Sequence, residues 1–148
     1  TAICYANLKK FPESFAALEK AEKILVELIE REPRNQVYQV DLARIYTNFG
    51  ETKLKTDNLD DALKAFENSI NIREKLLQTN TNNANTHRDF AVTLKNIGEI
   101  YAKRQEKDKA KTYYEKSLEI LTRLKNENPL SEFDNKLIEE LNKSLQHL

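Results

Sequence analysis

The stretch that decides the fold is DLARIYTNFGETKLKTDNLDDALKAFENSINIREKL, residues 41–76. It recurs as DFAVTLKNIGEIYAKRQEKDKAKTYYEKSLEILTRL, residues 89–124, at a shift of 89 − 41 = 48. No gap is needed, and 12 of the 36 aligned pairs are identical. Self-similarity at a fixed period of roughly 20–50 residues is typical of stacked-repeat architectures, which present a surface to a partner. Among the identical pairs are Gly50/Gly98, Ala62/Ala110 and Ser69/Ser117.

The flanking residues keep the same period. Asn35, Asn83 and Ser131 follow one another at this period, and all three are favoured at helix N-caps. Tyr5 lies two periods before Tyr101, so the first residues read as the tail of a helix. The sequence contains no methionine, and we expect it to be a fragment of a longer protein. The period predicts one repeat domain over residues 1–148, divided into a partial unit 1–34, full units 35–82 and 83–130, and a final helix 131–148.

Composition excludes several classes of protein. The 24 basic and 24 acidic residues give a net charge of zero, which argues against a nucleic-acid binder and against polybasic membrane targeting. No apolar run approaches the roughly 18 residues of a membrane span. The single cysteine, Cys4, excludes an internal disulfide framework and fits a reducing compartment, so we expect a cytoplasmic location. Two glycines and three prolines leave little loop and predict an all-α fold.

Apolar spacing and turn residues predict the helix bounds. Ser131 and Asp134 resemble a capping box at the start of the final helix. That helix is apolar on one side only, which is typical of a cap that ends a repeat array. Its apolar stripe consists of Phe133, Leu137, Leu141, Leu145 and Leu148. The predicted helices cover residues 12–32, 36–55, 59–78, 84–104, 107–127 and 131–147.

A family resemblance rests on small and aromatic residues that recur in phase. The second full unit has Ile97-Gly98-Glu99-Ile100-Tyr101, then Ala110 and Tyr114, and the first has Phe49-Gly50, Ala62 and Phe66. This pattern resembles the tetratricopeptide repeat, although Lys53 stands where the tyrosine is expected. The resemblance implies antiparallel helix hairpins stacked in a right-handed superhelix, an α-solenoid with a C-terminal capping helix. The repeated unit is longer than the usual unit of about 34 and looks like the long repeats of bacterial multidomain proteins.

The mid-helix glycines have a physical explanation. A glycine inside a helix costs up to about 1 kcal/mol relative to alanine, so close helix approach must offset that cost. We expect Gly50 and Gly98 to face the second helix of their hairpins. We expect Phe66 and Tyr114 to fill the space between adjacent units.

The resemblance also implies a function and a surface. In tetratricopeptide arrays the first helix of each pair lines a concave groove that binds a peptide or helix of a partner protein. Asn48 and Asn96 interest us most, because a carboxamide both donates and accepts hydrogen bonds and can hold a peptide backbone, although both could instead bond a neighbouring helix. Glu51 and Glu99 would repel a free C-terminal carboxylate of the kind that chaperone-binding members hold. By register the groove residues are Arg44, Thr47, Asn48, Glu51, Lys55, Val92, Lys95, Asn96, Glu99 and Lys103.

Other functions compete with this interpretation. The chain could instead be a regulatory or structural arm of a larger bacterial signalling protein, with an ATPase or caspase-like domain and no ligand of its own. A helical-repeat RNA binder is disfavoured by the charge balance. Association of two copies through the unfinished hairpin of residues 1–32 is a further alternative.

Catalysis and cofactors are not expected. His87 and His147 are far apart in the sequence, lack metal-ligand spacing and are predicted at the surface. The acidic cluster Asp57, Asp60 and Asp61 lacks the spacing of a calcium loop and is better explained by helix capping. No glycine-rich phosphate loop is present. We therefore predict no enzyme, no metal site and no cofactor.

Overall fold

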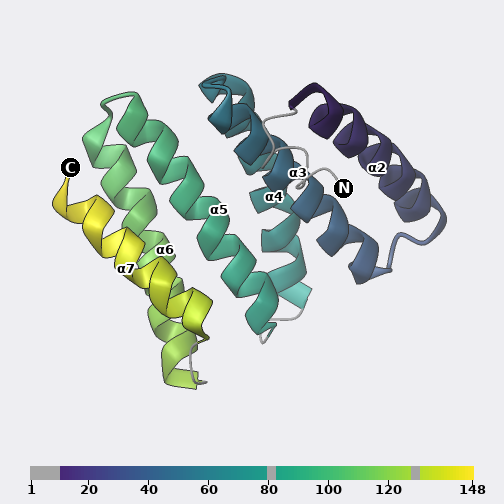
Figure 1. Ribbon diagram of the computed structural model, residues 1–148. Helices are drawn as coiled ribbons and strands as arrows, with labels where there is room; N and C mark the ends of the chain where they lie inside the picture. Colours follow the sequence, from purple (N-terminus) through teal and green to yellow (C-terminus); the bar gives the residue numbers. More distant parts are fainter. Residues whose placement is uncertain (1–10, 80–82, 128–130) are drawn as a thin grey trace. The chain divides into compact units, whose positions relative to one another are not determined.

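The computed structural model describes residues 11–79, 83–127 and 131–148, and within these residues the regular elements are α helices (Figure 1). Their bounds agree with the predicted ones to within one residue at each end. The predicted helix tail over residues 1–10, which contains Cys4 and Tyr5, lies outside the described residues. The helices are α2 (Phe11–Arg31), α3 (Gln36–Lys55), α4 (Leu59–Thr79), α5 (Ala84–Lys103), α6 (Lys107–Glu127) and α7 (Glu132–Gln146).

The chain divides into two compact units, Thr1–Thr79 and Asn80–Leu148, here called the first and second unit. In the first unit, α3 and α4 form a helix hairpin and α2 packs against α3. In the second unit, α5 and α6 form the equivalent hairpin and α7 packs mainly against α6.

Helix starts are fixed by the residues that the period singled out. The side chains of Asn35, Asn83 and Ser131 each accept a hydrogen bond from a main-chain N–H in the first turn of α3, α5 and α7. Each bond satisfies one of the N–H groups that a helix start leaves without an intrahelical partner. The Ser131 cap is a complete capping box with Asp134. The predicted caps are therefore confirmed.

The turn inside each hairpin also repeats. Asp57 has a φ of 58° and Gln105 a φ of 63°, both in the left-handed region and at corresponding positions of the repeat. After α3, the N–H of Asn58 donates to the carbonyl of Lys53 at 2.9 Å, which closes the α3 end in the manner of a Schellman motif. The same turn geometry thus sets the same hairpin in both units, without a glycine.

Each of the two glycines faces an aromatic ring on the second helix of its hairpin. A Cβ atom added to Gly50 would lie 2.4 Å from the Phe66 ring, and one added to Gly98 would lie 2.6 Å from the Tyr114 ring. The prediction that these glycines permit close approach is confirmed. Each aromatic ring also lies against the glycine of its own hairpin. Tyr114 packs in one cluster with Leu137 and Leu141 of α7, the helix of the next predicted unit. For Phe66, packing against the next unit stays a prediction.

The cap helix α7 is held by its apolar side. Leu137 and Leu141 are buried in the core of the second unit, and Leu145 and Leu148 pack against that core. Phe133 does not belong to this stripe, because 55% of its surface is exposed. Its neighbour Asp134 is the inward-facing residue of the first turn, and successive helix residues point about 100° apart.

Candidate functional site

The predicted partner-facing side of α3 is polar and carries both charges. Arg44 is exposed and lies 3.6 Å from the Asp41 carboxylate, one turn earlier on the same helix. Lys55 is exposed, whereas Asn48 and Glu51 are half-buried. Their spacing of four, three and four residues keeps these side chains on one side of the helix.

Thr47 is different, because it is 9% exposed and its hydroxyl is used inside the hairpin. Its Oγ1 donates to the Ala43 carbonyl at 3.1 Å and lies 2.9 Å from the Ser69 hydroxyl. The repeat register had placed Thr47 among the groove residues. The structure gives it a role in the contact between α3 and α4.

A buried arginine completes this polar contact, and sequence reasoning missed it. Arg73 is 1% exposed, and its Nη2 donates to Thr47 Oγ1 at 3.2 Å. The equivalent position one period later is Leu121, which is fully buried. That alignment was the available signal, because an arginine opposite a core leucine in a repeat indicates an inward-facing charge.

On α5 the five predicted residues differ in exposure. Lys103 is exposed, Glu99 is half-buried and Asn96 is only 6% exposed. Val92 packs against the core that includes Leu137 and Leu141 of α7. Lys95 Nζ lies 3.3 Å from the carboxylate of Glu140 in α7. Lys95 thus contacts the cap helix and Val92 packs on the core, whereas Lys103 and Glu99 offer more surface.

A second ion pair, also not predicted, joins α5 to α7. The Arg88 guanidinium donates two hydrogen bonds to the Asp134 carboxylate, one of them at 2.9 Å, and the Asp134 side chain is fully buried. Burial alone would raise the pKa of Asp134. The hydrogen bonds from Arg88 and Ser131 outweigh burial and hold that pKa below its ordinary value of 3.8. The same contact raises the pKa of Arg88.

The two histidines lie in different environments. His147 is exposed at the C-cap of α7, as predicted. The surface prediction for His87 is wrong, because this residue is 9% exposed and its ring nitrogens lie 2.9 and 3.1 Å from Arg123 Nη2. His87 faces α6 because it occupies an inward position of the α5 helix.

The acidic cluster at the start of α4 is part of a capping network. Asp61 accepts hydrogen bonds from Lys53 at 3.2 Å and from the Asn58 side chain at 2.9 Å. Lys53 is the main cause of the lowered pKa of Asp61. Within the residues that the structure describes, no group of three His, Cys, Asp or Glu side chains could hold a metal ion.

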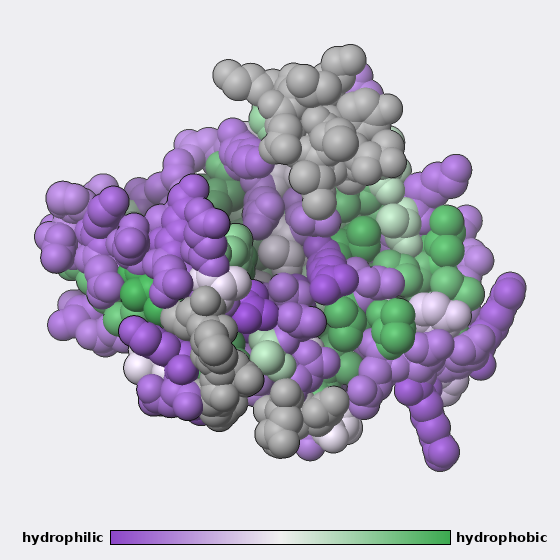
Figure 2. All heavy atoms as spheres, turned by 60° about the horizontal axis from the view of Figure 1, so that its bottom comes forward, coloured by the Kyte–Doolittle hydropathy of each residue, from purple (hydrophilic) through white to green (hydrophobic). Residues whose placement is uncertain are grey.

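Polar and charged side chains dominate the face drawn in Figure 2, with smaller apolar areas among them. None of the helices in the described part of the chain is long and apolar enough to cross a bilayer.

Comparison with known proteins agrees with this architecture. The family model described as tetratricopeptide repeat matches residues 41–123, which is more than half of the chain. A search among curated proteins finds no match. Tetratricopeptide repeats are protein-interaction modules and are typically not catalytic. With hairpins, glycines and aromatic positions in the same phase, the chain belongs to the tetratricopeptide repeat family.

Proposed function

We propose that this chain is a protein-interaction module, and that the outward side of α3 and the outward side of α5 each offer a surface to a peptide or helix of a partner protein. The observation that carries the proposal is the side of α3 formed by Arg44, Asn48, Glu51 and Lys55. It combines exposed charges with a half-buried carboxamide. Arg44 and Lys55 are exposed, so a partner can reach both side chains.

The chemistry of this side suits a polypeptide. The Asn48 carboxamide can donate to a peptide carbonyl and accept from a peptide N–H at the same time. Glu51 and Lys55 lie one turn apart and offer opposite charges. Glu99 and Lys103 repeat this pair at the corresponding positions of α5. A partner segment with charges of both signs would therefore find one Glu/Lys pair on each helix.

The test is a pull-down with the purified chain as bait, followed by mass spectrometry of the bound proteins. Asn48→Ala should lose the partner that the unchanged chain retains. Asn71→Ala is the matched control, because Asn71 is exposed on α4 and lies outside the proposed surface. Asn96→Ala is tested separately with a melting curve, because a buried carboxamide can contribute to stability.

Retention of the partner by Asn48→Ala would place recognition elsewhere and contradict the proposed surface. A chain that captures no partner at all would favour the alternative, in which the repeats serve as an arm of a larger signalling protein. Thermal melting of each variant shows that a loss of binding is not a loss of folding.

A further inference from the structure

A pocket lies in the first unit, between α2 and α4, with α3 as its floor. Its volume is about 290 Å³. Glu19 and Glu22 line it from α2, Tyr46 and Phe49 from α3, and Lys64 from α4. The pocket has aromatic rings at its base and two carboxylates on one wall.

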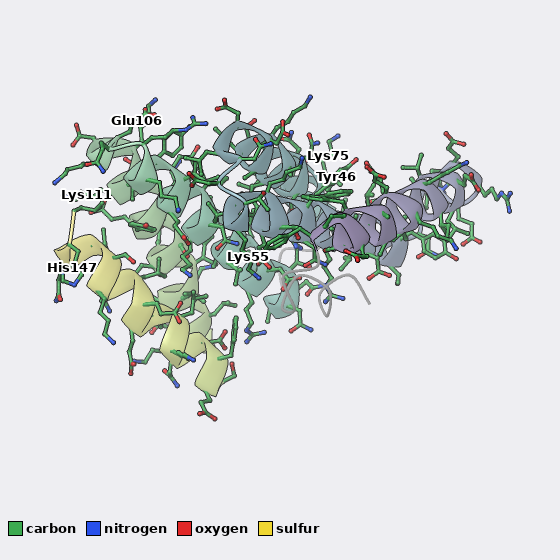
Figure 3. All side chains as sticks on the ribbon, turned by 45° about the horizontal axis from the view of Figure 1, so that its top comes forward. Tyr46, Lys55, Lys75, Glu106, Lys111 and His147 are labelled. Atoms are coloured by element: carbon green, nitrogen blue, oxygen red, sulfur yellow. The ribbon has the colours of Figure 1, made fainter. Side chains whose placement is uncertain are left out.

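This pocket does not belong to the surface proposed above. At about 100° per residue, Tyr46, Phe49 and Lys53 share one side of α3, and Asn48, with Arg44, Glu51 and Lys55, lies on nearly the opposite side. Tyr46 and Lys55 are labelled in Figure 3. The two faces of α3 can therefore be occupied and altered independently.

The floor of the pocket is packed against α2 by an aromatic contact. Phe49 stacks on Phe15 of α2, with ring centroids 6.4 Å apart. Lys53 Nζ lies 4.6 Å from the centre of the Phe15 ring and 3.2 Å from the Asp61 carboxylate. The charge of Lys53 is therefore already engaged by a carboxylate and a ring. It does not neutralise the acidic wall.

That wall keeps unused hydrogen-bonding capacity. Glu22 accepts a hydrogen bond from the Tyr46 hydroxyl. A carboxylate offers about four lone-pair sites, so one tyrosine leaves most of them available. Glu19 lies one turn earlier on the same side of α2 and is exposed. Across the lining, three carboxylates (Glu19, Glu22, Asp61) face two ammonium groups (Lys53, Lys64), which leaves a net negative charge.

We propose that this pocket binds the side chain of an arginine from a partner protein. A guanidinium is planar, so it can lie against aromatic rings such as Phe49 and Tyr46. Its donors also form a fork that can bond two acceptors together, here the carboxylates of Glu19 and Glu22. A lysine ammonium is a more strongly hydrated point charge and uses the flat floor less well. The proposal concerns a different face of α3 and does not rest on the function proposed above.

The first experiment is an NMR titration of the isotope-labelled chain with acetyl-arginine-amide. The amide signals of Glu19, Glu22 and Ala65 should shift in a saturable manner, with a dissociation constant in the millimolar range. Acetyl-citrulline-amide has nearly the same shape without the charge and should bind about tenfold more weakly or worse, because the charge-assisted bonds are lost. Equal shifts with both compounds, or no saturable shift, would overturn the proposal.

Charge-neutral variants then locate the site. Glu19→Gln/Glu22→Gln should weaken binding by about tenfold or more. The control Glu27→Gln/Glu30→Gln makes the same charge change at two exposed positions of α2 outside the pocket and should bind as the unchanged chain does. If the first double variant does not fold, Glu19→Gln alone replaces it, because Glu19 is exposed. Equal weakening in both variants would show attraction by net charge alone and contradict a built pocket.

Discussion

Ser117 donates a hydrogen bond of 2.7 Å to the main-chain carbonyl of Ala91 and so ties α6 to α5 inside the second unit. Ser69 donates to the carbonyl of Ala43 at 2.8 Å in the first unit. Both serines are fully buried. These four residues form two of the identical pairs of the repeat. The same hydrogen bond between two helices therefore occurs in both units, and the serine and the alanine that form it are identical in both repeats.

Ser117→Ala should destabilise the chain by about 1 kcal/mol, because a buried hydrogen bond is lost and the Ala91 carbonyl keeps only its helical partner. Urea-induced unfolding measures this change. Thr122→Ala is the control, since the Thr122 hydroxyl is exposed and bonds only within its own helix, to the Leu118 carbonyl. Equal effects of the two substitutions would show that the bond between helices contributes nothing beyond a local one.

Gly98→Ala should also destabilise the chain, by about 1–3 kcal/mol in unfolding experiments. The added Cβ would lie 2.6 Å from the Tyr114 ring and 3.3 Å from the Ala110 carbonyl oxygen, so the ring or the facing helix would have to shift. In an isolated helix the same substitution would stabilise by roughly 1 kcal/mol, so the two effects have opposite signs.

A double-mutant cycle identifies the ring as the cause. In a Tyr114→Leu background, the loss from Gly98→Ala should shrink, because the atoms nearest the new Cβ are gone. If the loss from Gly98→Ala is the same in both backgrounds, contact with Tyr114 does not explain why a glycine is required there.

Asp134→Asn should cost about 1.5–3 kcal/mol at neutral pH, because hydrogen bonds to a charged group are among the stronger ones. The pKa of Asp134 lies below 3.8 in the folded chain, since bonds from Arg88 and Ser131 outweigh the effect of burial. The stabilisation is therefore complete above pH 3.8 and is lost as the pH falls through the folded pKa.

Unfolding free energies of the unchanged chain and of Asp134→Asn should converge below pH 3.8. Glu132→Gln is the control, because Glu132 lies in the same first turn of α7 and is exposed. A difference between the chain and Asp134→Asn that is independent of pH would contradict an ionised Asp134 as the source of stability.

Tyr46 should ionise near pH 12, above its ordinary pKa of 10.0. Burial is the largest cause of the raised pKa, and the hydrogen bond to Glu22 and the charge of Glu22 raise it further. NMR of tyrosine labelled at the ring carbon Cζ follows this titration, and Tyr46→Phe assigns the signal. Glu22→Gln should lower the pKa of Tyr46 but leave it above 10.0, because burial remains.

The raised pKa of Tyr46 also makes the free energy of unfolding depend on pH. Its contribution is complete below pH 10.0 and is lost as the pH rises toward 12. Glu27→Gln, which is exposed on α2, should leave the Tyr46 titration unchanged. An unaltered Tyr46 pKa in Glu22→Gln would mean that Glu22 does not hold the hydroxyl in the pocket wall.

Much of the fold could be predicted because it follows from local signals. Helix starts are marked by the N-caps Asn35, Asn83 and Ser131, and helix ends by the turns after α3 and α5. Because the sequence repeats, each of these signals occurs again at the equivalent position, which supports its interpretation. The glycine positions follow from the same logic, since an unfavourable residue that recurs in phase indicates a packing requirement. Helix bounds were therefore predictable to within one residue.

Side-chain roles that differ between the repeats were harder to predict. Lys53 pairs with Asp61 in the first unit. The equivalent residues of the second unit are Tyr101 and Lys109, and Lys109 Nζ lies over the Tyr101 ring, 5.1 Å from its centre. An ion pair in the first unit is thus replaced by a cation–π contact at the equivalent positions of the second unit. This replacement is seen only in the three-dimensional contacts. The burial of Arg73 and His87 likewise depends on contacts across a hairpin, which no single-helix pattern reveals.

The central claim is that partners are held on the outward sides of α3 and α5, and site-specific photo-crosslinking tests it most directly. A photoreactive residue replaces Lys55 or Lys103 on the proposed surface, or Lys75 or Lys111 on the second helices of the two hairpins. All four lysines are exposed (Lys55, Lys75 and Lys111 are labelled in Figure 3). We predict a crosslinked partner from positions 55 and 103 and none from positions 75 and 111. Crosslinking from positions 75 and 111 alone would contradict the account.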